Sequence, residues 1–299
     1  MPPVLSMSTS LPSTASVDRG NDAGFHVRLR QRIDEHGPLC VGIDPSADLL
    51  IKCGLPDTAQ GALSFSTRLL EAADYRLAIV KPQSAFFERF GSAGIRALEE
   101  LIERAHCHGI LVLIDAKRGD IDTTAQAYAE AFFSPASPLR TDAVTLHAYL
   151  GLRALDKAIG FAVRNGGGVF VVVRSSNPEG EALQTARLAD GRTVAGSLCA
   201  DITALNSRLG GGALGPIGAV VGATCHDAAT TIAALPNAFI LAPGVGAQGA
   251  TLRDVAARMM QARGRVLPSV SREMLANGCE ARELRTTMRH FIDEARAFS

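Results

Sequence analysis

Eight short apolar segments recur along this 299-residue chain, and helical stretches separate them. Each segment is a nearly continuous apolar run, which is typical of parallel strands buried on both faces. Because strand and helix alternate eight times without a break in composition, we predict one (β/α)8 barrel of the α/β class over residues 25–299. A doubly wound open sheet is the structural alternative. The predicted strands are 39–44, 77–82, 111–117, 143–147, 169–176, 217–224, 238–246 and 265–270.

The intervals between these strands carry helix signals. Residues 91–109 place apolar side chains on one helix face and end at Gly109, a typical C-terminal stop. Segments 152–164, 192–209 and 280–297 have the same character. Helices of this length after each strand are what a barrel requires.

Composition excludes several classes of protein. Lys+Arg and Asp+Glu both total 30, so no global field attracts nucleic acid or a membrane surface. No apolar run approaches the roughly 20 residues that cross a bilayer. Residues 1–24 are rich in Ser, Thr and Pro and lack the features of a signal peptide, so we predict a flexible tail on a cytoplasmic protein.

The cysteines show no C-x-x-C spacing. In a chain of this length they are expected to be ordinary buried or semi-buried free thiols of a reducing compartment. They are Cys40, Cys53, Cys107, Cys199, Cys225 and Cys279.

Polar residues cluster where the predicted strands end. In barrel enzymes the rim at the C-terminal ends of the strands carries the catalytic residues, so we predict an active site there. The residues are Asp44, Lys81, Asp115, Lys117, His147, Ser175, Ser176, Thr224 and Arg272.

The densest signal is the segment 114–121, which contains Asp115, Lys117 and Asp120. Residues two apart in a strand share a face, so Asp115 and Lys117 are predicted to project toward the barrel axis, with Asp120 in the loop beyond. Neighbouring carboxylates would hold Lys117 charged as a fixed proton donor. A purely structural ion-pair network is the alternative.

The segment D-A-K-R-G-D-I at 115–121 resembles the D-x-K-x-x-D signature of the orotidine 5′-phosphate decarboxylase superfamily. The likeness runs in register from about Phe25 to the C-terminus. It implies a homodimeric barrel enzyme with shared active sites that converts orotidine 5′-monophosphate into uridine 5′-monophosphate and carbon dioxide without metal or cofactor. Further segments resemble the actinobacterial-type branch: VGIDPS (41–46), VKPQSAFFERFG (80–91), VTLHAYLG (144–151), VRSSNPEG (173–180) and LAPGVGAQGAT (241–251).

The resemblance also implies catalytic roles. Lys117 would protonate C6 of the pyrimidine after carbon dioxide leaves. Asp115 would lie beside the substrate carboxylate, and Lys81 would bridge Asp115 and the ribose hydroxyls. Asp120 of the partner subunit would complete the charged array.

The implied substrate-binding residues lie around this array. Asp44 would bind the ribose 3′-hydroxyl, and Thr124 of the partner subunit would reach the ribose. Ser176 would hydrogen-bond the pyrimidine. Gln248 and Arg272 would bind the phosphate, with Pro243 and Val245 in a closing loop. Ser271 is a further implied substrate-binding residue.

Two rival functions remain open at this point. One is a Mg²⁺-dependent relative that acts on a sugar phosphate with the same signature. The other is a catalytically silent barrel that binds a phosphorylated ligand, although Asp115, Lys117 and Asp120 all being present argues against it. The sequence departs from the family pattern at Ser46, where His is expected, and at Asp122, where Gly is expected.

Three further motifs have ordinary explanations. G-x-G-x-x-G at 244–249 matches a dinucleotide fingerprint, but a phosphate loop after the seventh strand explains it better. The run 106–108, His-Cys-His, is assigned to packing and not to a metal site. Asp227 is expected to cap a helix.

Overall fold

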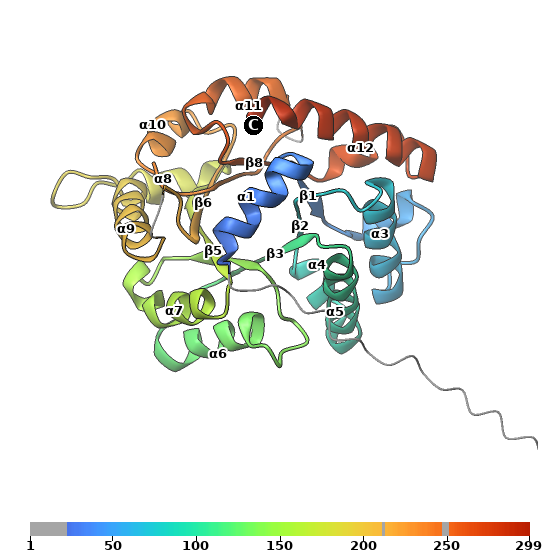
Figure 1. Cartoon of the computed structure of the whole chain (residues 1–299), viewed down its shortest axis with the longest axis horizontal. Helices are drawn as coiled ribbons and strands as arrows, with labels where there is room; N and C mark the ends of the chain where they lie inside the picture. The colour runs from blue at the N-terminus through green and yellow to red at the C-terminus, as the bar shows by residue number, and fades with distance from the viewer. Residues whose placement is uncertain (1–22, 211–212, 247–250) are drawn as a thin grey trace, which may run out of the picture.

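Eight parallel strands close into a barrel in the computed structural model (Figure 1), which describes residues 23–210, 213–246 and 251–299. Each strand pairs with the next in sequence, and β8 pairs with β1. This closure confirms the (β/α)8 prediction over the open sheet. The strands are β1 (Cys40–Ile43), β2 (Ile79–Pro82), β3 (Leu111–Arg118), β4 (Ala143–His147), β5 (Gly168–Arg174), β6 (Ile217–Val221), β7 (Ile240–Ala242) and β8 (Val266–Val270).

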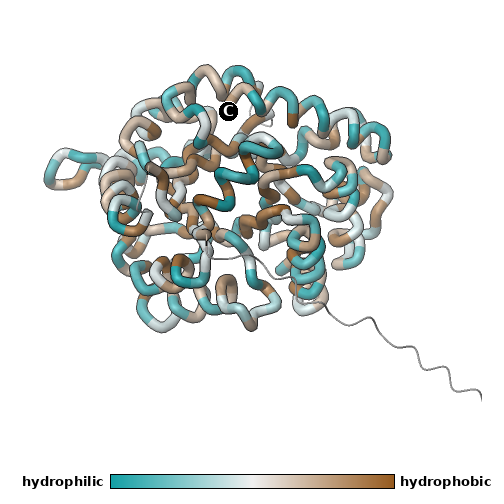
Figure 2. The backbone as a smooth tube through the Cα atoms, in the orientation of Figure 1, coloured by the Kyte–Doolittle hydropathy of each residue, from teal (hydrophilic) through white to brown (hydrophobic). Residues whose placement is uncertain are grey.

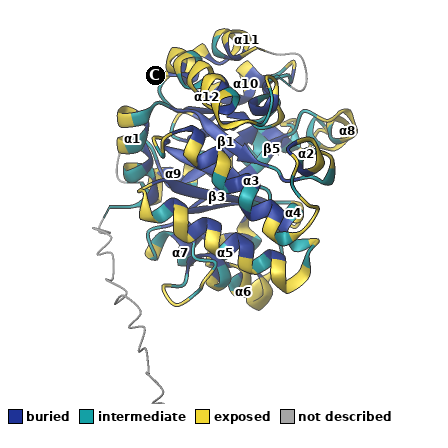
Figure 3. Cartoon of the chain, turned by 90° about the vertical axis from the view of Figure 1, so that its right-hand side faces the viewer, coloured by how far each residue is buried: buried dark blue, intermediate teal, exposed yellow. Residues whose placement is uncertain are grey.

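Helices surround the barrel and bury one face against it (Figure 3). The predicted helices at 91–109, 192–209 and 280–297 are confirmed as α5, α9 and α12, whereas 152–164 is a short 3₁₀ turn followed by α7. The helices are α1 (Phe25–His36), α2 (Ala47–Lys52), α3 (Ala59–Ala72), α4 (Ala85–Glu88), α5 (Gly91–Cys107), α6 (Asp122–Phe133), α7 (Asp156–Arg164), α8 (Glu181–Gln184), α9 (Val194–Leu209), α10 (Ala228–Ala233), α11 (Leu252–Arg258) and α12 (Ala281–Ala295), with 3₁₀ turns η1 (Leu152–Leu155), η2 (Pro178–Gly180), η3 (Met260–Ala262), η4 (Arg272–Leu275) and η5 (Arg296–Phe298).

Helix α1 lies across the N-terminal end of the barrel, in the foreground of Figure 1. Phe25 packs edge-on against Phe170 of β5, with ring centroids 6.1 Å apart. Leu29 and Ile33 join the apolar cluster inside the barrel. In Figure 2 brown, hydrophobic segments of the barrel lie behind the largely teal α1. Because this end is filled by side chains, the opposite end is the one left for a site.

A buried carboxylate ties α1 to the barrel. Asp142, just before β4, accepts hydrogen bonds from Arg28 Nη1 at 2.6 Å and from the backbone nitrogen of Val112 at 2.9 Å. His106 Nε2 lies 2.8 Å from Asp142 Oδ2, the oxygen that Val112 also contacts. Burial alone would raise the pKa of Asp142, but His106 and Arg28 outweigh burial and lower it. His108 stacks on Tyr75, so both histidines of the 106–108 run pack as predicted.

The prediction that all six cysteines are free thiols is wrong for two of them. Cys53 and Cys279 form a disulfide across a sequence separation of 226 residues, while Cys40, Cys107, Cys199 and Cys225 are free. The pairing is invisible to local spacing because it depends on β1 and β8 being neighbours in the closed barrel.

No helix within the described ranges is long and apolar enough to span a bilayer. The predicted tail, residues 1–24, lies outside the described residues except for its last two positions. Helix α1 begins immediately after it, at Phe25.

Candidate active site

A pocket of about 200 Å³ opens at the C-terminal ends of the strands. Its walls come from the ends of β1, β2, β5, β7 and β8, so distant parts of the sequence meet there. We call it the C-terminal pocket. It is lined by Asp44, Lys81, Ser176, Pro243, Gly244, Val245, Ser269, Ser271, Arg272 and Glu273.

Charges of alternating sign run from this pocket along three strand ends. Lys81 is only 6 % exposed, and its Nζ lies 3.2 Å from Asp115 Oδ2 and 4.0 Å from Asp44 Oδ1. Lys117 Nζ lies 2.6 Å from Asp115 Oδ1. Asp44, Lys81, Asp115 and Lys117 therefore form one chain of ion pairs, which we call the charged array.

Mutual attraction keeps the buried members of the array ionised. Burial alone would lower the pKa of Lys81, yet the carboxylates of Asp115 and Asp44 raise it. Burial alone would raise the pKa of Asp115, yet Lys81 and Lys117 lower it to about 2. Asp115 is consequently a carboxylate at neutral pH.

The backbone at Lys117 is irregular. The register between β3 and β4 shifts between Ile114 and Arg118, and Lys117 has a φ of 45°. Asp115 and Lys117 do lie together, as predicted, but β3 is not the regular strand from which that prediction was made. A side chain in this left-handed region costs roughly 1 kcal/mol, so the surrounding contacts must hold it there.

Thr145 of β4 supplies those contacts, and sequence reasoning missed it. Its Oγ1 accepts a hydrogen bond from the backbone nitrogen of Lys117 at 2.9 Å and donates one to Asp115 Oδ1 at 2.8 Å. One hydroxyl thus fixes both Asp115 and Lys117. The available signal was a polar residue inside the apolar strand A-V-T-L-H, two positions before His147.

Asp44 is held in place from β8. Its Oδ2 accepts a hydrogen bond from Ser271 Oγ at 2.5 Å. A Cβ at Gly42 would lie 2.8 Å from Ser271 Cβ, so glycine in β1 permits this close approach. Asp44 Oδ1 is buried and accepts no hydrogen bond from the described residues. A buried acceptor of this kind fits a hydroxyl donor from a ligand.

The end of the pocket near β7 and β8 has the parts of an anion site. Arg272 is exposed at the start of η4, and Pro243 and Val245 follow β7. Gly244 and Gly246 have φ values of 95° and 80°, which glycine adopts readily. Gln248 lies outside the described residues, as does the end of the G-x-G-x-x-G motif.

Two predicted site residues lie away from this pocket. Asp120 makes no ion pair with Lys117 within the described residues of its own chain; its carboxylate accepts a hydrogen bond from the backbone nitrogen of Ile121 at 2.8 Å. It lines a separate, mainly apolar pocket beside α6, and Thr124 is exposed on that helix. A single chain does not bring them to the charged array.

The unusual residues near the site have clear local structures. Ser46 caps α2 by accepting a hydrogen bond from the nitrogen of Leu49. Asp122 has a φ of 44°, which gives a physical reason for the glycine of the family pattern at that position. The prediction that Asp227 caps a helix is wrong for its side chain, which makes no cap hydrogen bond on α10 and pairs with Arg174.

Residues 37–286 match the model of the orotidine 5′-phosphate decarboxylase / HUMPS family. The orotidine 5′-phosphate decarboxylase of Salinispora arenicola is 48 % identical over 91 % of this chain and 97 % of its own. The enzyme of that name from Streptomyces coelicolor is 46 % identical over 91 % of this chain and 97 % of its own. The chain belongs to the orotidine 5′-phosphate decarboxylase family.

Solved structures agree with this membership. An orotidine 5′-phosphate decarboxylase candidate from Streptomyces avermitilis superposes with a TM-score of 0.86 at 46 % identity, covering 92 % of this chain and 95 % of the other. Leishmania donovani OMP decarboxylase superposes with a TM-score of 0.74 at 33 % identity, covering 92 % and 98 %. The chain is a carboxy-lyase of pyrimidine biosynthesis that converts orotidine 5′-monophosphate into uridine 5′-monophosphate (UMP) and carbon dioxide.

Proposed function

We propose that Lys117 is the proton donor of this decarboxylation, and the charged array is the observation that carries the proposal. Breaking the bond from C6 to the carboxylate leaves an electron pair in an sp² orbital at C6, with no π-system to accept it. A fixed ammonium beside C6 stabilises that charge and then delivers the proton that forms the C6–H bond. The 2.6 Å ion pair with Asp115 holds Lys117 Nζ in one position, as a fixed proton donor requires.

The other members of the array bind the substrate in this proposal. Asp115 lies beside the substrate carboxylate, and their repulsion disfavours the ground state. Asp44 Oδ1, which has no hydrogen-bond donor among the described residues, accepts from the ribose 3′-hydroxyl. Lys81 donates to the ribose from between Asp44 and Asp115.

The remaining pocket residues bind the two ends of the nucleotide. Ser176 hydrogen-bonds the pyrimidine, whereas Arg272 and Gln248 bind the phosphate. Ser271 holds Asp44 in place for the ribose. Pro243 and Val245 belong to the loop that closes over it. Binding energy from the phosphate, remote from C6, drives closure and the exclusion of water.

We propose that the reaction needs no metal ion. Both oxygens of Asp115 already face ammonium groups, Oδ2 that of Lys81 and Oδ1 that of Lys117, so the array neutralises the carboxylate with its own cations. Purified protein should therefore decarboxylate orotidine 5′-monophosphate equally well after dialysis against a chelator, as followed by the loss of its ultraviolet absorbance. Activity that disappears with chelator and returns with Mg²⁺ would favour the sugar-phosphate relative instead.

We also propose a homodimer with shared active sites. Asp120 and Thr124 lie outside the C-terminal pocket of their own chain, near exposed apolar side chains of the loop after β3, α6 and the loop after β4. These side chains are Ile121, Tyr128, Tyr149 and Leu150. Tyr149 is 75 % exposed, and burying such groups against a second copy would remove them from water. A two-fold axis would then place each chain's Asp120 in its partner's site.

Arg272→Ala should raise KM at least about tenfold, because a charge-assisted hydrogen bond contributes roughly 1.5–3 kcal/mol. It should also lower kcat, because phosphate binding drives loop closure in this proposal. Steady-state kinetics measures both. Arg263→Ala, a change at an exposed arginine before β8 that binds the C-terminal Ser299, is the matched control. An unchanged KM for Arg272→Ala would place the phosphate site elsewhere.

We propose a cytoplasmic location. The four free cysteines support it, and two of them are inert by burial, which raises the pKa of the Cys40 and Cys199 thiols to about 12. The Cys53–Cys279 disulfide counts against it, because such bonds are uncommon in reducing compartments.

A further inference from the structure

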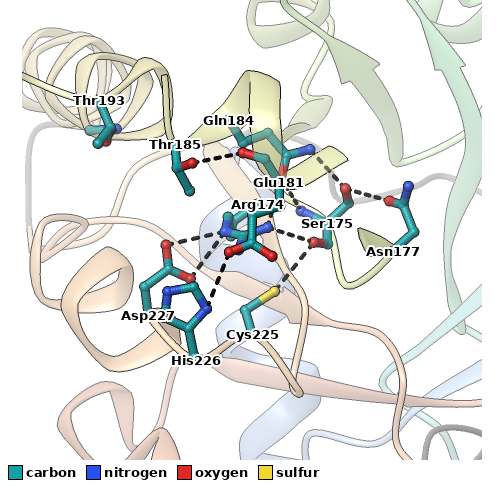
Figure 4. Close-up of polar contacts among 11 residues, drawn as sticks. Arg174, Ser175, Asn177, Glu181, Gln184, Thr185, Thr193, Cys225, His226 and Asp227 are labelled. Carbon is teal, nitrogen blue, oxygen red and sulfur yellow. Dashed lines mark hydrogen bonds and ion pairs between the residues drawn. The ribbon is translucent and has the colours of Figure 1, made fainter. Parts of the chain in front are cut away.

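Strand β5 ends in a buried arginine that none of the roles above uses. Arg174 is 3 % exposed, and its Nε donates to both carboxylate oxygens of Asp227, at 3.0 and 3.1 Å (Figure 4). Asp227 follows β6, so this ion pair joins two neighbouring strand ends. A buried guanidinium without a partner would be costly, and the carboxylates of Asp227 and of Glu181, whose Oε1 lies 3.9 Å from Arg174 Nη2, satisfy that need.

The contacts of Arg174 extend beyond this ion pair to the next residue, Ser175. Arg174 Nη1 donates to the Ser175 carbonyl at 3.1 Å and to Gln184 Oε1 at 3.2 Å. Gln184 Oε1 also accepts from the Ser175 backbone nitrogen at 2.9 Å, and its Nε2 donates to Ser175 Oγ at 2.7 Å. Cys225 Sγ donates to the same carbonyl at 3.3 Å. Every polar group of Ser175 is therefore held.

Ser176, the next residue, lines the C-terminal pocket. On its other side Asn177 is tied back, because Ser175 Oγ donates to Asn177 Oδ1 at 2.7 Å. A Cβ at Gly222 would lie 2.8 Å from both the backbone nitrogen and Cβ of Ser176, so the two loops also touch directly. Ser176 is thus held through both chain neighbours and by its close contact with Gly222. Figure 4 shows the contacts of the two neighbours, Ser175 and Asn177.

We propose that Arg174 is a positioning residue for recognition of the pyrimidine. Together with Asp227 and Gln184, which we call the Arg174 network, it holds the β5 loop so that Ser176 faces the base. The inference rests on the proposed role of Ser176. It predicts that the network affects the base and leaves ribose and phosphate recognition alone, because those groups meet residues from β1, β2, β7 and β8.

The test compares two ligands that differ by the base. UMP contains the pyrimidine, whereas ribose 5-phosphate contains only the remainder. Asp227→Asn removes the charge that pairs with Arg174, and Gln184→Leu removes the contacts to Ser175. Arg174→Lys keeps the charge but loses the fork that spans the three partners. Each should weaken UMP binding by about fivefold or more and leave ribose 5-phosphate binding within twofold, as measured by calorimetry.

The exposed ion pair Asp190–Arg192 lies in the same connecting segment between β5 and α9. Asp190→Asn is therefore the matched control, and it should change the affinity for neither UMP nor ribose 5-phosphate. Ser176→Ala supplies the reference. If the network acts through Ser176, Asp227→Asn and Gln184→Leu should cost little further UMP affinity in the Ser176→Ala background, because coupled residues are non-additive.

The outcomes test the positioning role of Arg174 separately from the proposed role of Ser176. Equal weakening of both ligands, or full additivity with Ser176→Ala, overturns the positioning role and leaves Arg174 as a structural ion pair. Ser176→Ala with unchanged UMP affinity overturns the role of Ser176 itself, and the positioning role with it. Loss confined to UMP, absent in the Ser176→Ala background, supports the inference.

Discussion

Lys117→Ala should lower kcat for decarboxylation at least about a thousandfold while UMP still binds. General acid catalysis contributes typically 10²–10⁴-fold, and stabilisation of the carbanion by a fixed charge adds to it. Lys117 acts chiefly on the transition state, whereas the phosphate-binding residues act on both states. The side chain is 48 % exposed, so its removal should leave the fold intact. Single-turnover assays and UMP titration measure the two effects.

Lys117→Arg separates acid catalysis from structural ion pairing. Arginine keeps a positive charge that can pair with Asp115, but its guanidinium does not give up a proton at any pH at which proteins are folded. We expect this variant to be as inactive as Lys117→Ala. If either variant retained more than a few per cent of the activity, Lys117 would not be the acid, and the charged array would be a structural network.

Mixing two inactive variants should restore activity if the sites are shared. A Lys117→Ala chain and an Asp120→Ala chain are each expected to be nearly inactive alone. In a mixed dimer one site collects both defects, while the other combines an intact Lys117 with an intact Asp120. Random equal exchange makes about half the dimers mixed, so roughly a quarter of all sites should recover.

Exchange has to be demonstrated for this experiment to be decisive. Mild denaturant followed by refolding should scramble the subunits, and native mass spectrometry of chains with different tags measures the mixed fraction. Each variant refolded alone is the control and should stay inactive. Complete exchange without recovery would mean that one chain builds its own site, which would contradict the shared-site proposal.

Much of the site followed from the sequence because a barrel gathers strand ends at one rim. Asp44, Lys81 and Asp115 lie 71 residues apart in the sequence at most, and each follows or ends an apolar run, which was enough to predict their meeting. The closeness of Asp115 and Lys117 was also predicted, although the irregularity in β3 was not. Local pattern does not encode a left-handed φ at a lysine, which depends on Thr145 from the next strand.

Other features depend on contacts between residues that are far apart in the sequence, which local patterns do not predict. The position of Asp227 just before α10 is typical of a helix cap. Its carboxylate instead binds the charged guanidinium of Arg174, which is buried at the end of the adjacent strand. Asp120 and Thr124 are polar residues beyond a strand, like the pocket residues, yet their own chain directs them elsewhere. Strand order alone does not say which polar residues turn inward.

The disulfide lies at the seam of the barrel. Every neighbouring pair of strands is consecutive in the chain except β1 and β8. The barrel closes where these first and last strands pair. Joining strands so far apart in the chain has the largest loop-closure entropy of any strand pairing in the barrel. Cys53 follows α2 just after β1, and Cys279 precedes α12 just after β8. In the chain-entropy model a link over such a separation removes roughly 5 kcal/mol of unfolded-state freedom, so the covalent bond reinforces the joint that chain connectivity leaves open.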